Sequence, residues 1–130
     1  MATSIAEHYS DELDNWVQSL NLYTIEMDLL ESKLYEIVRR NCIVGIAEKV
    51  NTYQVRLSNL SEKFDSLLET IEQQEEELKI DDKLVEDSLI NYETEKQQSE
   101  LRTKMQEIEK KYIDVKYDCN NFLTESLKSN

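Results

Sequence analysis

Residues 27–60 read MDLLESKLYEIVRRNCIVGIAEKVNTYQVRLSNL and contain the only glycine of the chain, Gly45. Apolar and aromatic residues recur on both sides of this glycine at alternating intervals of three and four residues, the spacing of a coiled coil. The two series are mirror images about a point between Ile43 and Val44, and they continue beyond the quoted stretch. Their members are Ile37, Leu34, Leu30, Met27, Tyr23, Leu20, Trp16, Leu13 and Tyr9 on one side, and Val50, Tyr53, Leu57, Leu60, Phe64, Leu67, Ile71, Gln74 and Leu78 on the other. Folding the chain at residues 41–46 brings the series face to face, so the sequence predicts an antiparallel helical hairpin.

Signals for helix ends place the helices of this hairpin at about residues 5–40 and 46–79. Ser4 and Glu7 have the spacing of a capping box, which satisfies free backbone N–H groups at a helix start. Arg39 and Arg40 come at the end of the first helix, where cations interact favourably with the helix dipole. The glycine then permits the backbone to reverse.

A second reversal is expected at residues 79–82, Lys-Ile-Asp-Asp, where a cation at a helix end precedes two acidic residues suited to a helix start. It leaves a third helix at about residues 83–127. The alternative is one helix over residues 46–127. The turn is favoured because helices gain most of their stability by packing an apolar face, and the long helix leaves its second half without a partner in the chain.

The third helix has an irregular apolar pattern. One stripe starts at Leu84, Val85, Leu89 and Tyr92, and a second, out of phase with it, follows as Leu101, Met105, Ile108, Tyr112, Val115, Cys119 and Phe122. The polar residues 93–100 separate them, so we expect a stutter or a local unwinding there. A reversal about residue 81 places Tyr112 opposite Val50 and Cys119 opposite Ile43. Residues 126–130 are expected to form a frayed tail.

Composition agrees with a single all-α domain over residues 1–130. The chain has no proline and one glycine, which leaves few sharp turns, and 33% of its residues are charged. The sequence therefore predicts an elongated, antiparallel, coiled-coil-like three-helix bundle. This architecture resembles a spectrin-type repeat in helix number and approximate helix length, although the sequence carries no motif of that family.

The net charge of −13 bears on possible partners. It disfavours nucleic acids and anionic membranes, since binding either would work against the overall field of the protein. The acidity suits a well-solvated surface, or alternatively a face that meets a basic partner. The first residues lack the basic and apolar regions of a signal peptide, and no apolar run approaches the roughly 20 residues that span a bilayer. We therefore expect a cytoplasmic protein.

Side chains for catalysis or metal binding are sparse. His8 is the only histidine, and the acidic run at residues 72–77 lacks the glycine turn of a calcium loop. We expect no catalytic residue, no metal, no cofactor and no small-molecule substrate, so the chain is not predicted to be an enzyme. Cys42 and Cys119 are placed near the same end of the bundle. They form either a possible redox pair or two reduced thiols.

The best candidate site is a surface for protein–protein contact. Leu22, Ile25 and Leu29 project from the first helix on the side opposite its heptad series, and Ile113 and Tyr117 form a shorter equivalent on the third. Either another protein or the third helix covers them. We predict a non-catalytic scaffold or adaptor that binds a protein partner or forms a homodimer. The alternatives are a thiol- or ligand-responsive sensor and a carboxylate metal-binding bundle.

Overall fold

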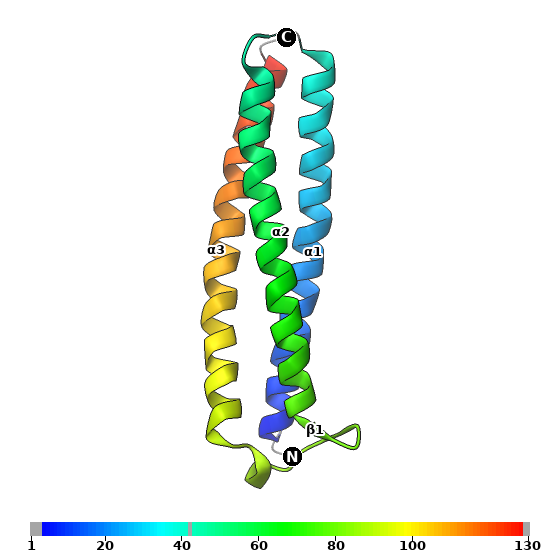
Figure 1. Ribbon diagram of the computed structural model, residues 1–130, viewed down its shortest axis with the longest axis vertical. Coiled ribbons are helices and arrows are strands. Elements are labelled where there is room, and N and C mark those ends of the chain that lie inside the picture. The colour runs from blue at the N-terminus through cyan, green and yellow to red at the C-terminus, as the bar shows by residue number, and fades with distance from the viewer. Residues whose placement is uncertain (1–3, 42, 129–130) are drawn as a thin grey trace.

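The computed structural model describes residues 4–41 and 43–128 and consists of three long helices packed side by side (Figure 1). The helices are α1 (Ile5–Arg40), α2 (Ile46–Glu77) and α3 (Tyr92–Lys128). Each packs against the other two, which confirms the predicted all-α three-helix bundle. The chain runs along the long axis, back, and along it again, so α1 and α3 point in the same direction.

The mirrored residues of α1 and α2 form the core together with one face of α3. All of them are buried or packed against the buried cluster. The predicted register of the hairpin is visible at Tyr23 and Phe64, whose ring centroids lie 6.2 Å apart. The core is therefore a column that runs the length of the bundle, and the outer sides of the helices face solvent.

The ends of the hairpin helices follow local rules. Ser4 Oγ accepts a hydrogen bond of 3.1 Å from the backbone N–H of Glu7, as expected for a helix cap. The backbone N–H and the side-chain amide of Asn41 both donate to the carbonyl of Ile37 and close the end of α1. Gly45 has φ +85°, a left-handed conformation that side chains disfavour. The only glycine is thus placed where the first reversal requires it.

The predicted turn at residues 79–82 is present, but the predicted start of the third helix at residue 83 is wrong. Two short antiparallel strands, β1 (Lys79–Ile80) and β2 (Lys83–Leu84), form a hairpin around Asp81 and Asp82. Asp81 and Asp82 have φ angles of 52° and 63°, so both central residues of this tight turn are left-handed. Aspartate tolerates this conformation better than most residues. A short 3-10 helix, η1 (Asp87–Leu89), follows.

α3 begins at Tyr92, where Asn91 provides the cap. Asn91 Oδ1 accepts hydrogen bonds from the backbone N–H of Thr94 at 2.9 Å and from its hydroxyl at 3.0 Å. Leu84 and Leu89, expected on the third helix, lie in the connection and are exposed. Val85 is buried there, and its backbone N–H donates to the carbonyl of Leu78 at 2.9 Å.

The longer connection also corrects the predicted pairing of α2 with α3. The ring of Tyr112 lies 6.1 Å from that of Phe64, so it does not face Val50. Next to Cys119, Asp118 pairs with Arg56 at 2.9 Å, which places Cys119 away from the predicted level of Ile43. The register fails because the hairpin and η1 use residues that the sequence analysis assigned to the helix.

The expected stutter at residues 93–100 is also wrong, because α3 is one continuous α-helix. Its buried positions extend from Leu101 back through Gln98 and Thr94 without a change of phase. At the other end, residues 126–128 of the expected tail are helical and Ser126 is buried, while residues 129–130 lie outside the described part of the chain.

Candidate functional site

The five predicted interface residues are all exposed, with 54% to 67% of each residue accessible to solvent. The third helix therefore does not cover them. They lie on the solvent-facing sides of α1 and α3 and are together called the α1–α3 face. Its members are Leu22, Ile25, Leu29, Ile113 and Tyr117.

An interaction between α1 and α3 brings the two parts of this face to the same level of the bundle. Tyr112 Oη donates a hydrogen bond of 2.5 Å to Glu26 Oε1, and Lys116 Nζ donates one of 3.0 Å to Glu26 Oε2. Ile25 directly precedes Glu26, while Ile113 and Tyr117 directly follow Tyr112 and Lys116. The apolar residues of α1 and those of α3 therefore lie at the same level of the bundle.

The same contact has a defined electrostatic character. Hydrogen bonds from Tyr112 and then Lys116 lower the pKa of Glu26 below its ordinary value, although partial burial opposes this. Burial, followed by the hydrogen bond to Glu26, raises the pKa of Tyr112. Tyr112 also stacks on Tyr23, with ring centroids 4.4 Å apart. A neutral phenol and an ionised carboxylate thus hold α1 and α3 together beneath the face.

A groove of about 420 Å³ lies between the last turns of α1 and α3. Its lining includes the apolar residues Leu123 and Leu127, with Lys33 and Arg40 among the charged ones. Leu127 is 68% exposed. This groove is thus partly apolar and partly basic. It lies at the end of the bundle where α1 and α3 both end.

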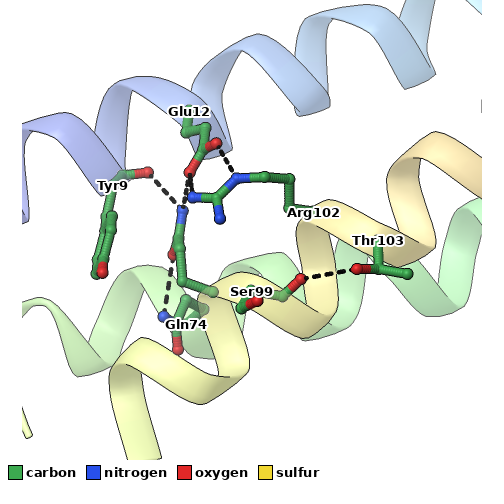
Figure 2. A network of polar contacts seen from close by, with 7 residues as sticks. Tyr9, Glu12, Gln74, Ser99, Arg102 and Thr103 are labelled. Carbon is green, nitrogen blue, oxygen red and sulfur yellow. Dashed lines mark hydrogen bonds and ion pairs between the residues drawn. The ribbon is translucent and has the colours of Figure 1, made fainter. Parts of the chain in front are cut away.

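A buried polar cluster joins all three helices near the other end of the bundle (Figure 2). Gln74 Nε2 of α2 donates to Gln98 Oε1 of α3 at 3.0 Å and to the carbonyl of Thr94 at 3.0 Å. Gln98 Nε2 donates to the carbonyl of Tyr9 at 3.2 Å and to Glu12 Oε1 at 2.9 Å, both on α1. Neither glutamine is accessible to solvent, so these hydrogen bonds fix the rotation of the helices at this level.

An ion pair extends this cluster towards the surface. Arg102 donates through Nε and Nη2 to the two oxygens of Glu12, at 2.6 and 2.7 Å. Burial alone would raise the pKa of Glu12, but the hydrogen bonds from Arg102 and Gln98 outweigh it, and the pKa lies below its ordinary value. Gln74 Oε1 is buried without a hydrogen-bond partner.

This cluster was not predicted, although two features of the sequence point to it. Gln74 is the only polar member of the mirrored series, where it opposes Leu13. Gln98 lies three residues before Leu101, in phase with the buried stripe of α3. Two glutamines at core positions of facing helices are typical of a paired polar layer.

The predicted redox pair is only partly described by the structure. Cys119 is a free, buried thiol, and burial raises its pKa, which disfavours the reactive thiolate. Cys42 lies outside the described residues. His8 is exposed near the start of α1. Within residues 4–41 and 43–128, no group of three or more histidine, cysteine, aspartate and glutamate side chains is arranged to hold a metal ion.

The chain was compared with protein families, curated proteins and solved structures. None of them matches.

Candidate membrane-spanning helices were sought over the same described residues. None of the helices there is long and apolar enough to cross a bilayer.

Proposed function

We propose that this protein is a non-catalytic helical scaffold that self-associates through the α1–α3 face. The observation that carries the proposal is the gathering of five exposed apolar side chains at one level of an otherwise strongly charged bundle. Single exposed apolar residues are ordinary on protein surfaces, whereas several at one level of a charged surface favour a site of contact. Burial of a leucine or isoleucine side chain contributes about 1.5–3 kcal/mol, so the face can supply much of the free energy of a protein contact.

The support beneath the face favours a rigid scaffold. The hydrogen bonds of Glu26 with Tyr112 and Lys116 and the stacking of Tyr23 on Tyr112 hold α1 and α3 in register at the level of the exposed residues. A surface that is ordered before binding loses less conformational entropy when it docks. The free thiol of Cys119 supports our assignment of the protein to the cytoplasm, where cysteines stay reduced.

The test is the mass of the protein in solution, measured by light scattering over a dilution series. We expect the wild-type chain to form dimers and the variant Ile25→Asp/Leu29→Asp to be monomeric, because each substitution places a charge where an apolar contact is required. Both positions are exposed, so the variant keeps the helical circular dichroism of the wild type.

The matched control is Val55→Asp/Leu89→Asp, which adds the same charge and removes two exposed apolar residues away from the face. We expect this control to keep the wild-type mass. The proposal is wrong if the wild-type chain is monomeric at every concentration, or if the Ile25→Asp/Leu29→Asp variant folds and still dimerises.

A further inference from the structure

We propose that the second copy docks on the α1–α3 face with its α1 antiparallel to the first α1, and that charges at the two ends of α1 set this orientation. The inference rests on the proposed function, because it assumes that the face mediates self-association. It adds the direction of the partner and the residues that select it.

The side of α1 that faces away from the core carries a continuous stripe of residues. With a rotation of about 100° per residue, Leu22, Ile25 and Leu29 belong to a stripe that continues towards both ends of the helix. This set is called the outer stripe, and all its members are exposed except Glu36, which is half-buried. The outer stripe comprises Glu7, Asp11, Asp14, Gln18, Leu22, Ile25, Leu29, Ser32, Glu36 and Arg40.

The outer stripe changes sign along its length. Its first turns carry only acidic charges, at Glu7, Asp11 and Asp14. Near its other end, Glu36 forms ion pairs of 3.2 Å with both Arg39 and Arg40, so one of the two positive charges is not neutralised. Lys33 lies beside the stripe and has no ion pair within the described residues. The outer stripe is therefore acidic at one end and apolar in the middle. At its other end Glu36 and Arg40 balance, and Arg39 and Lys33 beside the stripe make this region basic.

An antiparallel arrangement matches this pattern with itself. With the two-fold axis beside Ile25, Leu22 of each copy lies against Leu29 of the other, and Asp11 lies level with Arg40. A parallel arrangement instead places Asp11 against Asp11 and Arg40 against Arg40, and like charges across an interface disfavour association. The antiparallel pairing is also two-fold symmetric, so it closes at a dimer.

The groove between the last turns of α1 and α3 fits the same arrangement. In the antiparallel dimer, the acidic end of one α1 reaches the end of the bundle where Lys33 and Arg40 line the groove of the other copy. Leu123 and Leu127 add apolar surface to the same groove. Ile113 and Tyr117 lie at the level of the central pairing and are exposed, so α3 can contribute to the same interface.

Disulfide cross-linking tests the direction of the second copy. Gln18→Cys and Ser32→Cys are introduced separately into a Cys42→Ser background, which leaves the buried Cys119 as the only other thiol. In the antiparallel dimer, residue 18 of one copy lies beside residue 32 of the other. Two copies of residue 18 are then ~21 Å apart along the axis, from a rise of 1.5 Å per residue, beyond the Cα separation of about 7 Å that a disulfide tolerates.

We expect a covalent dimer when the two cysteine variants are mixed and oxidised, and loss of that product when either is oxidised alone. Cross-linking of either variant to itself, in a protein whose mass is dimeric, indicates a parallel dimer and overturns the inference while leaving the proposed function intact. A dimeric mass with no cross-link at all places the second copy elsewhere and also overturns it. A monomeric wild-type chain, including one that binds only an unrelated protein, overturns both proposals.

A charge exchange provides a second readout. Asp11→Lys/Asp14→Lys alone and Lys33→Glu/Arg40→Glu alone each place like charges at both ends of the antiparallel dimer. We expect each to weaken dimerisation about tenfold, and the combined variant to restore it. If the combined variant dimerises more weakly than either double variant, the ends of α1 do not face each other across the interface.

Discussion

The buried glutamine pair gives the sharpest prediction for stability. Gln74→Leu removes the donor to Gln98 Oε1, an atom that no solvent reaches in the folded protein. A buried polar atom left without a partner costs about 1–3 kcal/mol of stability. Gln98→Leu removes three hydrogen bonds, but Gln74 keeps its hydrogen bond to Thr94 and Glu12 keeps its ion pair with Arg102. We therefore expect this variant to lose about 1 kcal/mol of stability.

The double variant Gln74→Leu/Gln98→Leu is expected to be more stable than Gln74→Leu alone. Both polar groups leave together and two apolar side chains of similar volume replace them, a change that is often neutral or stabilising. Gln74 Oε1 strengthens this expectation because it is already buried without a partner. The two substitutions are therefore strongly non-additive, with a coupling of about 1–3 kcal/mol.

Urea unfolding followed by circular dichroism measures these free energies of unfolding. Gln73→Leu is the matched control, since Gln73 is the exposed neighbour of Gln74 and its substitution is expected to change stability by less than about 0.5 kcal/mol. If the double variant lowers the free energy of unfolding by the sum of the two single effects, the glutamines contribute independently. The interpretation as a paired polar layer is then refuted.

Two further predictions concern the connection and the ion pair. Asp82→Gly is expected to raise the free energy of unfolding by about 0.5–1 kcal/mol, because glycine adopts the positive φ of 63° without steric cost; a lower midpoint in urea contradicts this. Glu12 has a pKa below its ordinary value of 4.5, so its stabilising effect is complete above that pH and is lost as the pH falls through the lowered pKa. Glu12→Gln should therefore lose less stability than the wild type between pH 5 and pH 3, as measured by thermal unfolding. If the variant loses as much as the wild type, the Glu12–Arg102 ion pair does not contribute to the pH dependence of stability.

The α1–α2 hairpin was predictable because its information is local and repeated. The heptad series lies in one continuous stretch, and Gly45 marks the only place where it reverses. A pattern with so many members fixes the register of two helices, because a shift by one residue turns every apolar side chain away from the partner.

The start of α3 was not predictable from the same pattern. Leu84, Val85 and Leu89 have helix-like spacing, yet Asp81 and Asp82 turn the chain into a hairpin first. The preference of aspartate for a left-handed turn is weak, and acidic residues also suit a helix start. The levels at which α3 meets α1 and α2 depend on the length of this connection, so the error in its start carried over to the register.

The candidate site was likewise predictable only in part. The exposure of Leu22, Ile25 and Leu29 follows from helix geometry alone, since they lie opposite the heptad series of their own helix. That they lie at the same level as Ile113 and Tyr117 depends on the contact of Glu26 with Tyr112 and Lys116, which joins residues far apart in the sequence. Neither spacing nor composition contains that information.

The odd number of helices has a mechanical consequence. Because the chain crosses the bundle three times, Ser4 and Lys128 lie at opposite ends of it (Figure 1). α1 alone, with 36 residues, spans about 54 Å. Anything attached at these two positions is held apart by that distance, and tension between them acts along the helices and loads the α1–α2 and α2–α3 contacts in shear. The bundle is therefore suited to act as a stiff spacer.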